Sequence, residues 1–374
     1  MVNIAMATYT EEVGVLGKIK TELQTHGVNV PAALQDELEK EWNAPAIKNG
    51  RFVFLLEQPV TGLFTTVLII NGKFADNSPF HMVKASSGRY EIWKNNEKFT
   101  NIAMMPRPKY YDRCTRDGVR MSDIAVIGEP DHLRSVLNQR CGYQAMGKAC
   151  KFCAVESWWA GFTAKSPCHV AEVAEAAFKE GMIRHVTLST GTKLSPGKGL
   201  EDLVETARLI HQRASVTKTL NFEPLSDYSL LESLLHEGKE AGATTALCNI
   251  ECFDENLRED IMPMKGRNTI KDYMRVWEKC VNIFDHNEVY TMVIAGLGED
   301  DESILRGVEL AASMGVVASI VPHTPMRKAV YEDMKPPRVE RMLRLYAEAL
   351  PIYEQYGLKL YGGTGGIYTS LKGM

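Results

Sequence analysis

Apolar residues recur at helical spacing over the first forty residues of the chain. The stretch LGKIKTELQTHG ends at a glycine, and PAALQDELEKEW follows with a proline suited to a first helical turn. From Arg51 the pattern changes to short segments rich in β-branched and aromatic residues, separated by turn-forming stretches such as Asn-Gly and Ser-Ser-Gly. We therefore expect residues 1–120 to form a small α+β accessory region with an antiparallel sheet.

Beyond Tyr111, strand patterns alternate strictly with amphipathic helical patterns. Strands are expected at HLRSVLNQ, RHVTLST, TKTLNFEP, ATTALCNIE, EVYTMVIAG, VASIVPHTP and LKLYGG. Such alternation predicts a parallel sheet covered by helices, and this number of strands suits a barrel better than a short open sheet. The predicted fold is α/β, a partial or complete (β/α) TIM-type barrel with a C-terminal extension at residues 121–374.

Composition and charge narrow the classes of partner. The chain has 374 residues, of which 45% are apolar, so it can bury a sizeable core without disulfides. Its formal net charge is -4 and it has no run of lysines and arginines, which argues against nucleic acid. The start of the chain lacks an export signal, and the most apolar stretch is interrupted by Glu57, Gln58 and Pro59. We expect a cytoplasmic protein that does not bind a membrane.

Three of the eight cysteines fall in the segment CGYQAMGKACKFC, at Cys141, Cys150 and Cys153. In a reducing compartment, clustered cysteines are more often metal ligands or catalytic groups than disulfides. Three thiolates from one loop can bind three irons of a [4Fe–4S] cluster and leave the fourth iron open to a small molecule. They can also fill three corners of a structural zinc site, with Cys168 or His169 as the fourth ligand. The second alternative predicts a binding module without catalysis.

Polar residues, a cysteine and a glycine directly follow the predicted strands. They are Cys141, Thr190, Glu223, Glu251, Gly296 and His323. In β/α barrels the active site is built from the loops at the carboxyl ends of the strands. One site could therefore collect all of these residues.

The cysteine loop resembles the signature loop of the radical S-adenosylmethionine (SAM) enzymes. It follows the first barrel strand and carries an aromatic residue, Phe152, directly before the last cysteine. The commonest form of that loop has three and two intervening residues, whereas this one has eight and two. The resemblance implies a [4Fe–4S] cluster on Cys141, Cys150 and Cys153, SAM on its open iron, and Phe152 near the adenine.

Other segments resemble motifs of the same superfamily. LSTGT stands where the family has a Gly-Gly-Glu motif for the SAM amino group; it contains Thr190 and Gly191 but no acidic residue. NIECFDENLREDIMP resembles a segment of biotin synthase-like members, in which the residue matching Glu251 contacts SAM. TMVIAGLGED resembles the Gly-x-Ile-x-Gly-x-x-Glu segment beside the adenine, with Gly296 and Glu299 matching. SIVPHTP resembles the apolar-Pro strand end of the biotin synthase-like branch.

The resemblance extends to a narrower group. TELQTHGV, PKYYDRCTRDGV, NFEP and IMPMKG resemble radical SAM proteins encoded beside nitrilases in bacterial gene clusters. Members of that group end in a cysteine-rich tail, whereas this chain ends in YGGTGGIYTSLKGM, without cysteine. Within NFEP, Glu223 is a candidate contact for SAM or substrate, or a polar residue before a proline without such a role.

The resemblance implies reductive cleavage of SAM to a 5′-deoxyadenosyl radical, which abstracts hydrogen from a small-molecule substrate. An electron donor such as flavodoxin or ferredoxin would be a partner. An alternative is sulfur insertion, as in biotin or lipoyl synthesis, which requires a second cluster. Cys248 and Cys252 could join Cys168 or Cys280 around such a cluster, although we interpret Cys248 and Cys252 first as core residues.

Overall fold

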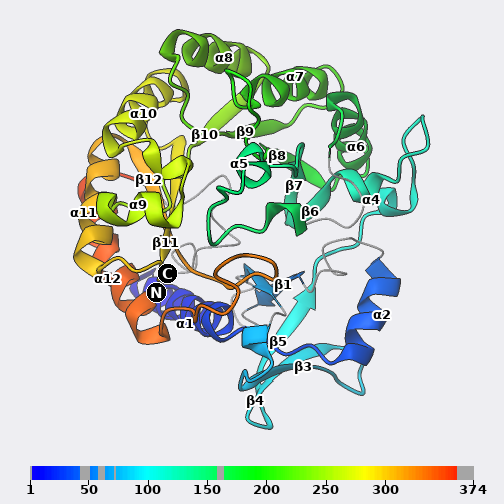
Figure 1. Ribbon diagram of the computed structural model, residues 1–374. Helices are drawn as coiled ribbons and strands as arrows, with labels where there is room; N and C mark the ends of the chain where they lie inside the picture. The colour runs from blue at the N-terminus through cyan, green and yellow to red at the C-terminus, as the bar shows by residue number, and fades with distance from the viewer. Residues whose placement is uncertain (1, 43–50, 58–63, 71–72, 158–163, 360–374) are drawn as a thin grey trace.

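The computed structural model describes residues 2–42, 51–57, 64–70, 73–157 and 164–359 (Figure 1). The N-terminal region begins with helices α1 (Val2–His26) and α2 (Ala32–Trp42). Its five strands are β1 (Arg51–Glu57), β2 (Phe64–Ile70), β3 (Phe80–Lys84), β4 (Tyr90–Lys94) and β5 (Glu97–Met104). They form an antiparallel sheet in the order β2-β1-β5-β4-β3. The expected α+β character is confirmed, with β5 as an additional central strand.

The rest of the chain builds a curved sheet of seven strands in the order β12-β11-β10-β9-β8-β7-β6. The strands are β6 (Val126–Glu129), β7 (Asp131–Val136), β8 (Ile183–Ser189), β9 (Thr217–Asn221), β10 (Ala243–Leu247), β11 (Val289–Ala295) and β12 (Val316–Pro322). Strands β7 to β12 are parallel, and β6 pairs antiparallel with β7 at the edge. The predicted partial barrel is confirmed.

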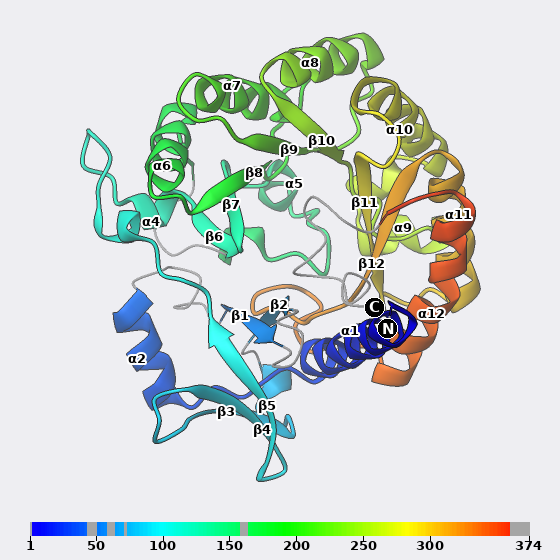
Figure 2. The ribbon, with the colours of Figure 1, turned by 180° about the vertical axis from the view of Figure 1, so that it is seen from behind.

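Helices cover the convex side of this sheet, as Figures 1 and 2 show from opposite directions. They are α6 (Pro167–Lys179), α7 (Leu200–His211), α8 (Tyr228–Glu240), α10 (Ile270–Phe284), α11 (Asp301–Ser313) and α12 (Val339–Gln355). The short helices lie in connections: η1 (Lys73–Ala75), η2 (Lys109–Asp112), α4 (Met121–Ile124), α5 (Gly142–Ala145), η3 (Val155–Ser157), α9 (Glu255–Ile261) and η4 (Lys265–Arg267). Within the described ranges, no helix has the length and apolar character needed to cross a membrane.

The last predicted strand, LKLYGG, is not found as far as the structure can test it. Leu358 and Lys359 are not in a strand, and the remaining residues of that segment lie outside the described ranges. Among the described strands, β6 and β12 are the two edges and do not pair with each other. The barrel of the described residues is therefore open between these edges.

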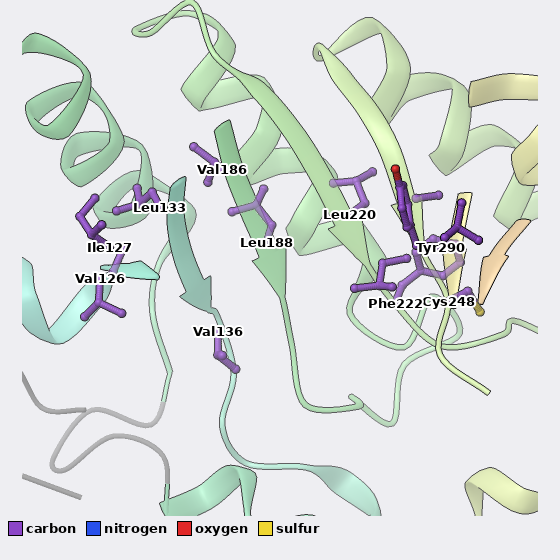
Figure 3. Close-up of a cluster of buried hydrophobic side chains, with 14 of the residues drawn as sticks. Val126, Ile127, Leu133, Val136, Val186, Leu188, Leu220, Phe222, Cys248 and Tyr290 are labelled. Atoms are coloured by element: carbon purple, nitrogen blue, oxygen red, sulfur yellow. The ribbon is translucent and has the colours of Figure 1, made fainter. Parts of the chain in front are cut away.

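A buried apolar core joins the sheet to its helices (Figure 3). Leu133, Val186, Leu188 and Leu220 are fully buried in the same cluster as apolar residues of α6 and α7. Because side chains alternate across a strand, His185 and Thr187 of β8, which flank Val186, face the concave side. The concave side is the interior of the partial barrel.

The N-terminal region packs against the barrel through several contacts. Helix α1 lies along α12, and Lys73 forms an ion pair of 3.0 Å with Glu332. The Tyr110 hydroxyl donates to the Ala125 carbonyl at 3.1 Å, and the Ile127 amide donates to the Tyr111 hydroxyl at 3.1 Å. Residues before position 121 thus pack against the start of the barrel sheet at β6.

Candidate active site

The cysteine loop follows β7 and carries all three predicted ligands. Cys141 stands directly before α5, and a turn closed by the Cys153 amide and the Cys150 carbonyl, at 3.0 Å, brings the other two together. Burial raises the pKa of the Cys153 thiol to about 11 and that of Cys150 well above its ordinary value. Binding of a metal cluster requires both thiols to lose their protons.

Backbone hydrogen bonds connect this loop to three other segments. The Gly142 amide donates to the Thr192 carbonyl at 2.7 Å, after β8. The Lys151 amide donates to the Ile261 carbonyl at 2.9 Å, and the Lys151 carbonyl accepts from the Tyr331 amide at 2.8 Å. The cysteine loop therefore lies against the ends of the β8, β10 and β12 units.

Thr190 and Gly191, the predicted SAM contacts after β8, form hydrogen bonds within the loops. The Thr190 hydroxyl donates to the Gly191 carbonyl at 2.9 Å, and the Gly191 amide donates to the Asn138 carbonyl at 2.6 Å. A β-carbon on Gly191 would lie 2.9 Å from the Asn138 carbonyl oxygen and 3.3 Å from the Cys141 Cα. Glycine is needed here because two backbones meet beside the first cysteine.

Glu251 follows β10 in a left-handed conformation with φ of 59°, which is uncommon for a residue other than glycine. Its backbone pairs with β11, because its carbonyl accepts from the Ile294 amide at 2.8 Å. Its Oε1 accepts a hydrogen bond from Lys265 Nζ at 2.6 Å. Its Oε2 is buried and has no hydrogen-bond partner among the described residues. A buried carboxylate oxygen in this state is suited to receive a donor from a ligand.

Arg258, a second cation near Glu251, binds backbone carbonyls rather than the carboxylate. Its guanidinium donates to the carbonyls of Ile250 at 3.0 Å and Cys252 at 2.6 Å, on either side of Glu251. A further bond of 3.0 Å reaches the Asn268 carbonyl. Arg258 therefore fixes the backbone that carries Glu251, while Lys265 provides the ion pair.

Lys265 is a site residue that sequence reasoning missed. It lies in η4 and is buried, close to Glu251, Glu223, Tyr273 and Cys150. Burial by itself lowers the pKa of Lys265, but the surrounding acidic groups, Glu251 first, outweigh it and raise the pKa well above its ordinary value. The only signal in the sequence was its place in IMPMKG, which resembles a family segment without indicating the role of the lysine.

Glu223 follows β9 and also carries a buried oxygen without a hydrogen bond. Its Oε2 lies 3.8 Å from Lys198 Nζ, which donates to the Pro224 carbonyl at 2.7 Å. Tyr143 of the cysteine loop lies beside Glu223, and burial together with this carboxylate raises the pKa of Tyr143. Glu223 is thus brought to the cysteine loop, as the positions of the strand ends predicted.

Gly296 and Glu299 form the turn after β11. Gly296 has φ of 101°, a conformation that favours glycine, and a β-carbon there would lie 3.0 Å from Pro337 Cδ. The Glu299 carboxylate accepts from the Gly296 amide at 2.8 Å and from the Leu297 amide at 3.0 Å. These bonds give Glu299 a structural role in the turn.

Phe152 and His323 lie at the edges of the same region. Phe152 is half-buried against a small apolar cluster formed by Cys252, Ile261, Met262 and Leu297. His323 is buried beside Tyr331, with ring centroids 6.2 Å apart, and its Nε2 has no partner in the described part of the chain. Burial lowers the pKa of His323, so its imidazole is neutral at physiological pH.

Of the four cysteines considered for a second cluster, three are buried and one is exposed. Cys248 and Cys280 are buried in the main core, and Cys252 belongs to the small cluster behind Phe152. Cys168 is exposed on α6. Their interpretation as core residues is confirmed for Cys248 and Cys252.

His169, considered as a fourth zinc ligand, interacts with another side chain. The Nε2 atom of His169 lies 2.6 Å from an Asp117 carboxylate oxygen. Across the described ranges, no three His, Cys, Asp or Glu side chains converge closely enough to hold one metal ion. A [4Fe–4S] cluster sets its cysteines further apart, because each binds a different iron. Three cysteines beside two buried carboxylate oxygens that accept no hydrogen bond from the described residues fit such a cluster with a cationic ligand.

A parallel barrel with three cysteines on the loop after its first parallel strand defines a class of cluster-binding enzyme. The model of the Radical SAM superfamily matches residues 140–311, which contain all three cysteines, Glu223, Glu251 and Gly296. Residues 140–311 therefore match a radical SAM domain, and this match supports an enzyme. Members bind a [4Fe–4S] cluster and SAM. The match also favours an enzyme over a zinc-stabilised module without catalysis.

Solved structures resemble the chain at low sequence identity. Methylornithine synthase (PylB) has 14% identity and a TM-score of 0.42, over 64% of this chain and 71% of that protein. The FeFe-hydrogenase maturase HydG from Carboxydothermus hydrogenoformans has 14% identity and a TM-score of 0.47, over 60% of this chain and 52% of HydG. The radical SAM methyltransferase TsrM from Kitasatospora setae, with cobalamin and a [4Fe–4S] cluster bound, has 13% identity and a TM-score of 0.40. The match covers 67% of this chain and 48% of TsrM.

No curated protein sequence matches the chain. The chain spans about half the length of HydG and TsrM. No substrate or partner is transferred from these proteins to this chain.

Proposed function

We propose that this enzyme cleaves SAM reductively and uses the resulting radical to abstract hydrogen from a small polar molecule. The observation that carries the proposal is the meeting of the cysteine loop with Glu223 and Glu251, each of which has one buried oxygen, Oε2, without a hydrogen-bond partner among the described residues. SAM carries ammonium and hydroxyl donors that such oxygens accept.

Cys141, Cys150 and Cys153 would ligate the cluster. The SAM contacts would come from Phe152, Thr190, Gly191, Glu223, Glu251 and Gly296. When bound and reduced, the cluster and SAM supply a 5′-deoxyadenosyl radical that takes a hydrogen atom from the substrate. The protein binds and orients the reactants and, with Phe152 and the apolar cluster behind it, limits access of water.

The concave face of the sheet favours a polar substrate. His132 lies 2.6 Å from the Thr187 hydroxyl, and His185 lies 2.7 Å from Thr217 and 2.8 Å from Thr219. These hydrogen bonds make the interior of the partial barrel polar. We therefore take a small polar molecule as the substrate class of the proposal.

An external electron donor such as flavodoxin or ferredoxin would reduce the cluster. The cysteine loop reaches the protein surface, because Met146 is 46% exposed and Lys148 is also exposed. A partner could therefore approach the loop directly. A cytoplasmic location follows from the same proposal, since a reduced cluster and free thiols require a reducing compartment.

The first experiment is anaerobic reconstitution with iron and sulfide, followed by dithionite and SAM. We expect one [4Fe–4S] cluster per chain and formation of 5′-deoxyadenosine. Cys150→Ala should lose both the cluster and SAM cleavage while keeping its circular dichroism spectrum. Cys168→Ala, on the outer helix α6, is the matched control. Undiminished SAM cleavage in Cys150→Ala would refute the proposal, and about eight irons per chain would favour sulfur insertion.

A further inference from the structure

The backbone around Lys265 is held so that its side chain is buried. The Lys265 carbonyl accepts from the Asn268 amide at 3.2 Å and from the Asn268 side chain at 3.1 Å. A β-carbon on Gly266 would lie 2.2 Å from the Arg258 carbonyl oxygen, so glycine lets η4 pack directly on α9. The Lys265 side chain is only 11% exposed. Burial of an ammonium group is costly unless it is paired.

The ion pair between Lys265 and Glu251 is incomplete on one side. Lys265 Nζ donates to Glu251 Oε1 at 2.6 Å, while Glu251 Oε2 is buried without a partner among the described residues. If this buried carboxylate had only a structural role, the fold would be more stable with a hydrogen bond to each of its two oxygens. One oxygen is thus fixed by the protein and the other is left for a ligand.

We propose that Lys265 is a positioning residue for cofactor binding: it holds Glu251 ionised and oriented, so that Oε2 accepts a hydrogen bond from SAM. The inference rests on the proposed function, because it takes SAM as the ligand of this site. It adds Lys265 to the proposed site and gives Lys265 and Glu251 different roles. Lys265 acts through Glu251 and does not contact the reacting atoms.

The charges around Glu251 explain why a lysine is required. Burial raises the pKa of Glu251, and nearby Glu223 raises it further, whereas Lys265 and then Arg258 lower it. Arg258 is engaged with backbone carbonyls, and the other ionisable neighbours, Cys150, Cys153 and Tyr273, add no positive charge. Without Lys265, the pKa of the Glu251 carboxyl should therefore rise further, and the carboxyl should take up a proton more readily.

Four variants separate this role from a general structural one. Lys265→Met removes the positive charge and keeps a side chain of similar length, and Lys265→Arg keeps the positive charge. Glu251→Gln removes the group that Lys265 orients. Lys151→Met is the matched control, since Lys151 adjoins Cys150 but pairs with the exposed Asp260 at 2.6 Å. For each reconstituted protein, iron content and the Kd of SAM are measured anaerobically from pH 6.5 to 9.

We expect Lys265→Met to keep its iron and to bind SAM about tenfold more weakly than wild type at pH 7. The ratio of its Kd to the wild-type Kd should fall as pH rises, because the Glu251 carboxyl then ionises without help. Using this ratio cancels the titration of SAM itself. Lys265→Arg should bind SAM nearly as tightly as wild type. Glu251→Gln should bind SAM weakly at every pH, and the Kd of SAM for Lys151→Met should equal that of wild type.

Two results would overturn the inference. One is wild-type affinity in Lys265→Met at every pH. The other is a deficit that does not change with pH, which would assign Lys265 a purely structural role. Failure of the proposed function would look different, because the wild-type protein itself would then take up no iron or bind no SAM.

Discussion

The absence of one β-carbon, at Gly191, lets the loop after β8 lie against the backbone of the first cysteine. A methyl group there would meet the Asn138 carbonyl oxygen and the Cys141 backbone, neither of which belongs to a flexible side chain. The distance between the two loops is therefore set by the main chain. An added β-carbon must therefore shift the backbone of Asn138, of Cys141 or of the loop that carries Gly191.

Gly191→Ala should lower the iron bound after reconstitution by about half or more while leaving the fold intact, because the strain falls on a loop outside the core. Iron per chain and the cluster absorbance measure this effect. Gly142→Ala is the control, since its β-carbon would mainly meet Leu194, an exposed side chain that can move aside. Equal iron content in Gly191→Ala and wild type would contradict the prediction.

At the residue scale, the sequence predicts groups whose chemistry depends on residue type and on position at a strand end. The cysteines, Glu223 and Glu251 were found in this way, and the structure brings them together. Lys265 was missed because a lysine in an irregular loop carries no periodic signal that tells a buried ammonium from an exposed one. The SAM contacts of these residues stay predictions.

At the scale of elements, parallel pairing builds a polar row across the concave face of the barrel. His132 is in register with His185, His185 with Thr217, and Thr219 with Thr245. The rings of His132 and His185 meet edge to face at 4.6 Å. Burial lowers the pKa of His185 to about 3, so this imidazole is neutral in the folded protein.

Acid should therefore destabilise the metal-free protein through His185. The unfolded chain takes up a proton below about pH 6.5, whereas the folded protein resists it until about pH 3. Stability is complete above pH 6.5 and falls as the pH drops, by up to about 1.4 kcal/mol per pH unit from this group. Urea unfolding at pH 7, 6 and 5 measures the slope.

His185→Asn should unfold with a shallower dependence on pH than wild type, because the group that titrates is gone. Its stability at pH 7 should be lower, since the pair of hydrogen bonds to Thr217 and Thr219 is altered. Identical slopes for the two proteins between pH 7 and 5 would show that His185 does not contribute.

Periodicity located the six parallel strands and the helices between them, because strongly patterned elements carry their own signal. Two strands were missed for a physical reason. Strand β6 has only four residues, and half of the residues of β5 are polar, so each strand is stabilised by pairing with neighbours rather than by its own pattern. Such contacts are tertiary and cannot be read from a local window.

For the whole molecule, the N-terminal region and the barrel share contacts on both sides of the predicted boundary at residue 120. Helix α1 covers part of α12, and Tyr110 and Tyr111 hydrogen-bond the start of the first barrel strands. Burial raises the pKa of Tyr111 to about 12, in keeping with its place inside the core. Part of the barrel core is therefore supplied by residues before the boundary.

Residues 121–374 expressed alone should give little soluble protein and melt well below the full chain. Residues 106–374 should be recovered in higher yield, because they keep the hydrogen bonds of Tyr110 and Tyr111, but should still melt below the full chain without α1 on α12. Soluble yield and melting temperature test this order. A 121–374 protein as stable as the full chain would show that the two regions are independent.

The position of Lys151 between the Ile261 carbonyl and the Tyr331 amide has a consequence for biosynthesis. When the cysteine loop leaves the ribosome, both of its backbone partners have yet to be translated, and the second lies beyond the last barrel strand. The cysteines therefore reach their final arrangement only near the end of chain synthesis. Cluster insertion into this enzyme should follow release of the finished chain, with the thiols kept reduced in the interval.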